Sequence, residues 1–114
     1  MKEVVWVGDS LENVRSFPKA VRRRIGEALR FAQRGGKHPV AKPLRGIGTG
    51  ILEIVALHET DTYRAVYTVK IGEKIYILHA FQKKSKRGIK TPKKEIDLIQ
   101  RRLRVAQEME AENE

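Results

Sequence analysis

The stretch TYRAVYTVKIGEKIYILHAFQK, residues 62–83, decides the fold of this chain. Two β-rich runs, Thr62–Ile71 and Lys74–Lys83, flank the dipeptide Gly72-Glu73, and this spacing is typical of a tight two-residue hairpin. The second run is apolar on both faces, which predicts a central strand that is covered on both sides along much of its length.

Side chains alternate between the two faces of a strand, so each run also predicts which residues lie together. In the first run, Arg64 is expected on the face opposite Tyr63. In the second run, one face is expected to carry Ile75, Ile77, His79 and Phe81, and the other Tyr76, Leu78 and Ala80.

Strand-like segments on the N-terminal side extend this hairpin. The run Ile51–His58 precedes it across a short turn, which predicts an antiparallel meander, and Glu3–Val7 reads as a short first strand. The intervening stretch Lys37–Gly50 contains two prolines and three glycines and is expected to be a loop. Its glycines do not follow a strand in a βαβ unit, so they do not predict a nucleotide-binding loop.

Helical segments occupy the rest of the chain. A short helix is expected over Ser10–Phe17, where Asp9 and Glu12 form a capping box. A longer one is expected over Pro18–Arg34 because its apolar residues recur at three- and four-residue steps. The last helix starts at Thr91 and Pro92, a side-chain N-cap followed by a first-turn proline.

These elements together predict an α+β fold, with an antiparallel sheet, two N-terminal helices on one face and a C-terminal helix. We expect one domain over residues 1–114, with an acidic end at about 107–114 that frays.

Composition narrows the class of protein. No apolar run approaches the roughly 18 residues of a membrane span, and the N-terminus lacks the apolar centre of a signal peptide. There are no cysteines, which is usual for a cytoplasmic protein. The formal net charge is +10, although four acidic residues lie in the last seven positions. This charge favours a nucleic acid or the ribosome as partner; the alternative is that it only aids solubility.

The residues supply little metal chemistry but many cations. Three widely separated histidines form no metal-binding motif, so neither a metal nor another cofactor is expected. A cationic set could instead cleave RNA, whose 2′-hydroxyl is the nucleophile. Arginine and lysine would stabilise the developing charge and a histidine would move a proton. The candidate catalytic residues are Arg64, His79, Lys83 and Lys84, and the candidate RNA-backbone contacts are Lys42, Arg45, Lys86 and Arg87.

Each of these residues has a simpler alternative role. His79 could be a hydrogen-bonded structural histidine, Arg64 could pair across the sheet with Glu53, and Lys83–Lys94 could be an electrostatic tether. A further cationic group lies on the second helix. It could be a solvated face, a nucleic-acid contact or a docking surface for an acidic partner, and it comprises Lys19, Arg22, Arg23, Arg30 and Arg34.

Three segments carry a family resemblance: SFPKAVRRRIGEAL (16–29), AKPLRGIGTGILEI (41–54) and TYRAVYTVKIGEKIYILHAFQKKSKRGIKTPKKEIDLIQRRL (62–103). Over about residues 3–106 the chain resembles the phage-derived Gp49-like proteins, in the HigB-like branch of the RelE/ParE toxin superfamily. The resemblance implies a RelE-like fold and the toxin role in a type II toxin–antitoxin pair.

The resemblance also implies an activity and partners. Many relatives cut mRNA on the ribosome without a metal and leave a cyclic phosphate. The partner would be a helix-turn-helix antitoxin, with which the toxin could form a hetero-oligomer. Arg64 corresponds to a position where relatives often place a phosphate-contacting arginine, and His79, Phe81, Lys83 and Lys84 correspond to the strand end that carries their acid, base or cationic groups. The alternatives are a ParE-like inhibitor of DNA gyrase and an attenuated remnant that binds only its antitoxin.

Overall fold

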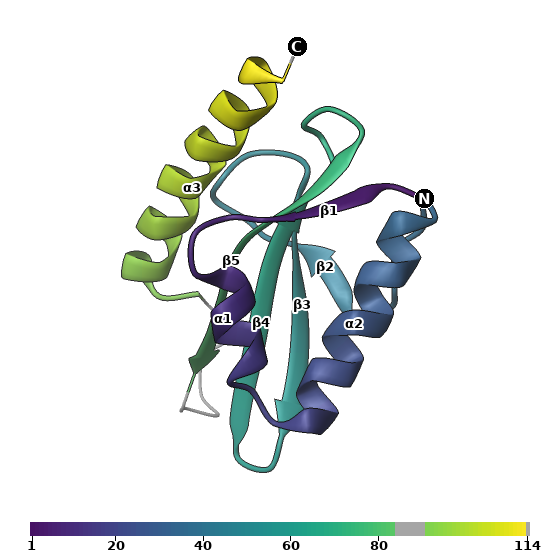
Figure 1. The fold of residues 1–114 in the computed structure, drawn as a ribbon. Coiled ribbons are helices and arrows are strands. Elements are labelled where there is room, and N and C mark those ends of the chain that lie inside the picture. The colour runs from purple at the N-terminus through teal and green to yellow at the C-terminus, as the bar shows by residue number, and fades with distance from the viewer. Residues whose placement is uncertain (84–90, 114) are drawn as a thin grey trace.

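A five-stranded mixed sheet forms the centre of the molecule (Figure 1). This computed structural model describes residues 1–83 and 91–113. The strands are β1 (Glu3–Trp6), β2 (Ala41–Pro43), β3 (Ile51–His58), β4 (Asp61–Thr68) and β5 (Lys74–Lys83), in the spatial order β1-β5-β4-β3-β2. The predicted meander is confirmed by the antiparallel pairs β3–β4 and β4–β5, and β5 is central as predicted.

The expectation of a fully antiparallel sheet is wrong at one edge. Strand β1 pairs with β5 in parallel, with Val4 opposite Ile75 and Trp6 opposite Ile77. The two hairpins fix the direction of β5, and β1 covers its free edge with Val4, Val5 and Trp6. This pairing is between strands far apart in the sequence, so the local pattern did not reveal its direction.

The stretch predicted to be a loop, residues 37–50, contains a short strand. Residues Ala41–Pro43 form β2, which pairs antiparallel with β3 and places Lys42 opposite Glu53. A proline is tolerated here because β2 lies at the sheet edge, where one side of the backbone needs no partner.

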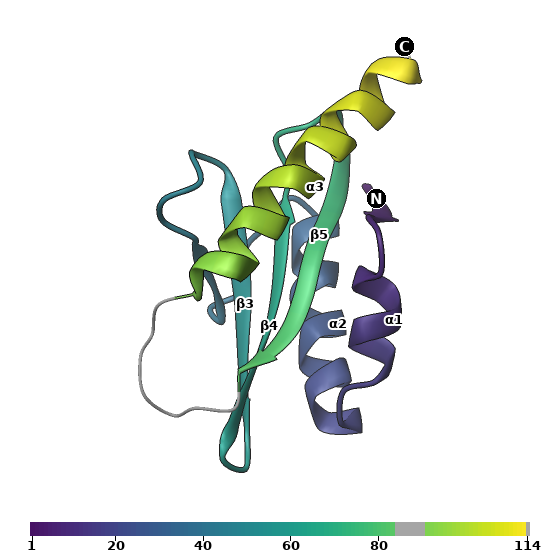
Figure 2. The same ribbon diagram turned by 90° about the vertical axis from the view of Figure 1, so that its left-hand side faces the viewer.

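Helices cover both faces of the sheet, as Figure 2 shows. Helices α1 (Ser10–Arg15) and α2 (Lys19–Gln33) lie on one face, and α3 (Lys93–Glu112) lies on the other. The two N-terminal helices on one face and the C-terminal helix agree with the prediction. Among the described residues, no helix is long and apolar enough to cross a membrane.

The expected side-chain caps of α1 and α3 are absent. Neither helix start makes a side-chain capping bond. Asp9 instead accepts a hydrogen bond from Arg102 Nη2 at 2.6 Å, and the Thr91 hydroxyl donates to Glu53 Oε2 at 3.5 Å. Both polar side chains are used in tertiary contacts that a local capping pattern cannot include.

The core is divided by the sheet into two layers. The layer beneath α1 and α2 contains apolar residues of these helices together with Tyr63, Ala65 and Tyr67 of β4. The layer beneath α3 contains Val66, Leu78 and Ile99. Strand β5 contributes to both layers, which explains why its sequence is apolar on both faces.

A β-bulge in β5 changes which face His79 occupies. Val66 pairs with His79 and Tyr67 pairs with Ile77, so Leu78 has no opposite residue. An extra residue of this kind reverses the alternation beyond it. His79 and Phe81 therefore lie on the α3 face, with Tyr76 and Leu78, rather than with Ile75 and Ile77. The face predicted for His79 and Phe81 is wrong for this reason.

The buried position of Leu78 gives a stability test. Leu78 is fully buried under α3, whereas Leu57 is 66% exposed at the end of β3. Leu78→Ala should lower the free energy of unfolding by about 2–5 kcal/mol because it leaves a cavity. The identical substitution Leu57→Ala should change it by less than about 0.5 kcal/mol. Urea unfolding measures both, and equal losses would contradict this assignment of the core.

Candidate functional site

A buried ion pair joins β3 and β4 on the face that α3 covers. In the register of these strands Arg64 lies opposite Val55, so Glu53 is its diagonal neighbour on the same face. Arg64 Nη1 donates hydrogen bonds to both carboxylate oxygens of Glu53, each at 3.0 Å. The side chains are only 4% and 6% exposed. The pairing considered as an alternative for Arg64 is therefore present.

A pocket of about 610 Å³ opens beside this pair. Glu53 is one of its lining residues, and Thr91, just before α3, and Ile96, in the first turn of α3, contribute from the other side. The opposite wall comes from β2 and the residues after it: Lys42, Pro43, Leu44, Arg45 and Gly46.

Two of the predicted RNA-backbone cations, Lys42 and Arg45, are exposed residues of this wall. Strand pairing places Lys42 directly opposite Glu53, on the same face of the sheet. The pocket thus combines a carboxylate with two cations. Such an arrangement can bind a phosphate and accept a proton from a neighbouring hydroxyl.

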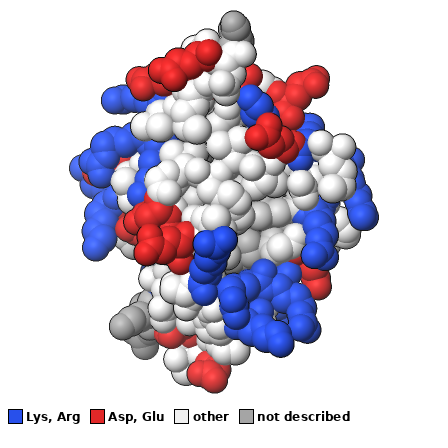
Figure 3. All heavy atoms as spheres, in the orientation of Figure 1, with Lys and Arg blue, Asp and Glu red and all other residues white. Residues whose placement is uncertain are grey.

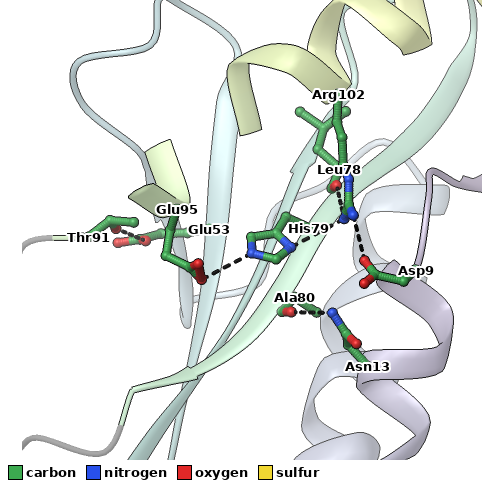
Figure 4. Close-up of polar contacts among 9 residues, drawn as sticks. All are labelled: Asp9, Asn13, Glu53, Leu78, His79, Ala80, Thr91, Glu95 and Arg102. Carbon is green, nitrogen blue, oxygen red and sulfur yellow. Dashed lines mark hydrogen bonds and ion pairs between the residues drawn. The ribbon is translucent and has the colours of Figure 1, made fainter. Parts of the chain in front are cut away.

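His79 connects β5 with α3 (Figure 4). Its Nε2 lies 3.0 Å from Glu95 Oε2, and its Nδ1 lies 3.3 Å from Arg102 Nη1. Because arginine only donates, Nδ1 is the acceptor and Nε2 carries the proton given to Glu95. The His79 side chain is 6% exposed, and its ring stacks on Phe81 with a centroid separation of 5.2 Å. Burial lowers the pKa of His79, and the nearby Glu95 carboxylate opposes this only in part.

Arg102 extends these contacts to the start of α1. Its Nη1 donates to the Leu78 carbonyl at 3.2 Å, and its Nη2 donates to Asp9. This hydrogen bond lowers the pKa of Asp9. Gly8 leaves the necessary space: its φ is +57°, and a Cβ there would lie 2.8 Å from Arg102 Cζ. The bulge directs the Leu78 carbonyl towards α3. The Arg102 side chain of that helix therefore holds the bulge in place through its hydrogen bond to this carbonyl.

The other predicted site residues lie along β5 and beyond it. Lys83 is partly exposed at the end of β5, on the face of Arg64, since it pairs with Thr62. Lys84, Lys86 and Arg87 lie outside the described residues. Within residues 1–83 and 91–113, no group of three or more histidines and acidic residues could hold a metal ion.

Three residues that complete the site, Glu53, Glu95 and Arg102, were not among the predicted site residues. Glu53 was named only as a possible partner of Arg64, and its position as an acidic residue inside an apolar strand was the available signal for a lining role. Glu95 and Arg102 are seven residues apart on α3, a spacing that places them on one side of a helix. Their contact with His79 depended on the bulge, which the sequence pattern did not predict.

A mixed sheet with two N-terminal helices on one face and a C-terminal helix on the other is compatible with the RelE-like α+β fold. Residues 12–104 match the family model described as Phage derived protein Gp49-like (DUF891). The chain belongs to this family, as its resemblance predicted, and the membership points to the toxin of a toxin–antitoxin pair. No curated protein gives a match to the chain.

The lowered pKa of His79 predicts a pH dependence of stability. In the unfolded chain His79 has the ordinary histidine pKa of about 6.5, whereas in the folded chain burial lowers the pKa of His79. The free energy of unfolding should therefore fall as the pH is lowered from about 7.5 to 5.5, because the unfolded state then binds more protons. The lowered pKa of Asp9 acts in the same direction but below about pH 4.

Urea unfolding at a series of pH values measures this dependence. Between about pH 7.5 and 5.5, a range that brackets the ordinary histidine pKa of about 6.5, the free energy of unfolding of the His79→Gln variant should depend much less on pH than that of the wild type. His58→Gln is the matched control and should keep the slope, since His58 is partly exposed and outside this network. An unchanged slope in His79→Gln would contradict the assignment.

Proposed function

We propose that this toxin cuts RNA, specifically mRNA on the ribosome, by a reaction that uses the RNA 2′-hydroxyl and no metal. The observation that supports this most is the pocket that combines Glu53 with Lys42 and Arg45. The net charge of +10 supports a polyanionic substrate. Action on the ribosome agrees with the cytoplasmic location expected from the sequence.

The Glu53 carboxylate is the general base in this proposal. It takes the proton of the 2′-hydroxyl, and the 2′-oxygen then forms a bond to the adjacent phosphorus. The bond from phosphorus to the 5′-oxygen breaks, and that oxygen takes a proton from water. The products are a 2′,3′-cyclic phosphate and a 5′-hydroxyl end.

The cations around the pocket bind the reacting phosphate. Lys42 and Arg45 neutralise the charge that grows on its oxygens as the pentavalent transition state forms. Lys83 and Lys84, which the sequence predicts as catalytic residues, would hold the scissile phosphate. Lys86 and Arg87 would contact the RNA backbone, as the sequence also predicts.

Arg64 and His79 act through other residues in this arrangement. Arg64 holds the Glu53 carboxylate in place through hydrogen bonds to both of its oxygens. His79 holds Glu95 and so positions the start of α3, which forms one wall of the pocket. The phosphorane contact predicted for Arg64 and the proton transfer predicted for His79 would both require α3 to move away from the sheet.

One alternative has a specific observation in its favour. The burial of Arg64 and His79 fits an attenuated toxin that retains only antitoxin binding. In that case the pocket would bind no substrate. The partner in either case is an antitoxin, for which the sequence resemblance implies a helix-turn-helix protein.

Mapping of 5′ ends after brief induction tests the proposal. The wild-type protein should produce new mRNA ends with 5′-hydroxyl groups. The Lys42→Gln/Arg45→Gln variant should reduce them strongly, and Glu53→Gln should reduce the cleavage rate by about 10²–10⁴-fold, the usual contribution of a general base. Lys42 and Arg45 are exposed, so their loss should leave the fold intact even if Glu53→Gln, which leaves Arg64 unpaired, destabilises it.

Glu12→Gln is the matched control, because Glu12 is an exposed acid on α1, on the other face of the sheet. It should cleave like the wild type. Intact mRNA with the wild-type protein would favour the attenuated toxin. Undiminished cleavage by the Lys42→Gln/Arg45→Gln variant would exclude this pocket as the site.

A further inference from the structure

Helix α2 carries a line of cations on its solvent face. Lys19, Arg23, Arg30 and Arg34 are four, seven and four residues apart and are all exposed. At 3.6 residues per turn these spacings place them within about 60° around the helix axis. They form a strip, here named the basic ridge, along most of the length of α2 and its C-cap, which at 1.5 Å per residue is about 22 Å.

The basic ridge has no acidic partners in the described part of the chain. None of its four members makes an ion pair there, whereas the more buried cations Arg64, Lys74 and Arg102 all do. Two pairs of its members are spaced i,i+4, an arrangement that is unfavourable for like charges on a helix. Helix α2 contains one acidic residue, Glu27. Glu27 is spaced i,i+4 from Arg23 and i,i+3 from Arg30, but it makes no ion pair with either among the described residues. A line of exposed cations without ion pairs points to an external polyanion.

The basic ridge is separate from the pocket that Glu53 lines. Helix α2 packs on one face of the sheet, while the pocket is formed against α3 on the other face (Figure 2). In Figure 3, Lys and Arg side chains gather along the side of the molecule where Figure 1 places α2. A ligand on the ridge would therefore leave the pocket open.

The chemistry of this surface favours nucleic acid over a protein. Protein interfaces have an apolar centre, whereas the large exposed apolar residue of α2, Phe31, lies beside the ridge and packs on the ring of His38. Long cationic side chains along a line instead suit the regularly spaced phosphates of a nucleic-acid backbone. Duplex RNA is recognised mainly through its shape and backbone.

We propose that the basic ridge binds the backbone of duplex RNA while single-stranded RNA occupies the pocket on the other face. The choice of RNA rather than DNA rests on the proposed function. The inference that the ridge binds phosphates rests on its exposed cations alone and is independent of that function. Duplex RNA on the basic ridge would hold the protein on a structured RNA such as the ribosome provides. The pocket on the opposite face would then be directed to a second, single-stranded RNA segment.

A pair of charge-matched variants tests the proposal in the full chain. Arg23→Gln/Arg30→Gln removes two ridge cations, and Arg101→Gln/Arg104→Gln removes two exposed cations of α3. Both change the formal net charge by the same amount. Binding of a labelled blunt RNA duplex is measured by fluorescence anisotropy across a salt series. The ridge variant should bind about tenfold more weakly, and its slope of log K against log salt should fall by about 2.

The control variant on α3 should change the duplex affinity by less than about twofold, and Arg23→Lys/Arg30→Lys should retain the wild-type slope because it keeps the charge. An equal loss in the two Gln variants would overturn the proposal, because binding would then follow net charge alone. Tighter binding of a DNA duplex of the same sequence, or displacement by poly-glutamate at lower concentrations than by RNA, would also overturn it.

Duplex affinity is measured independently of mRNA cleavage, so the two proposals can fail separately. If the wild-type protein does not cleave mRNA but the Arg23→Gln/Arg30→Gln variant binds the RNA duplex more weakly than the wild type, only the proposed function is overturned. Normal cleavage by a ridge variant whose duplex affinity is also unchanged would overturn only this inference.

Discussion

The buried pair of Glu53 and Arg64 is the interaction on which the organisation of this site depends. Removing two charges from water costs several kcal/mol for each, and a pair at 3.0 Å offsets that cost only when its geometry is good. The strand register brings the two side chains together diagonally on one face, but only Nη1 of Arg64 contacts the carboxylate. The buried Nε of Arg64 has no hydrogen-bond partner among the described residues. Since buried ion pairs contribute little to net stability, the position of this one beside the pocket is better explained by the chemistry of the carboxylate.

Helix α3 turns this face of the sheet into a pocket, and polar contacts fix the helix near both ends. In its first half, Glu95 and Arg102 bind the two ring nitrogens of His79. Near its end, Glu110 accepts hydrogen bonds from Lys74 and Tyr76 at 2.9 and 2.8 Å. The bulge at Leu78 makes the first set possible, because it places His79 on the same face as Arg64. The position of α3, whose start forms one wall of the pocket, is therefore fixed by contacts of His79 and Glu110 that lie outside the pocket.

Much of the fold could be predicted from local patterns in the sequence. The hairpin turn at Gly72-Glu73, the apolar stripe of α2 and the two-sided burial of β5 all follow from periodicity and turn chemistry. The parallel pairing of β1 could not be predicted in this way, because it joins segments about 70 residues apart in the sequence.

The candidate site was predicted less completely, and for related reasons. Lys42, Arg45 and Arg64 were selected, and the structure brings all three close to Glu53 through strand pairing or the pocket lining. The face of His79 was mispredicted because a single extra residue in β5 reverses the alternation. Asp9 and Thr91 fit local capping patterns, but tertiary partners compete for their side chains.

We propose that Glu53 and Arg64 are buried for catalysis rather than for stability. Replacing both by apolar residues of similar size, in Glu53→Leu/Arg64→Met, separates these roles because no unpaired charge remains. The measurement is the free energy of unfolding of this variant together with its yield of new mRNA 5′ ends. The expected result is a stability equal to or above that of the wild type, with cleavage abolished. A double variant that still cleaves mRNA, or one that loses stability as severely as a single substitution, would contradict it.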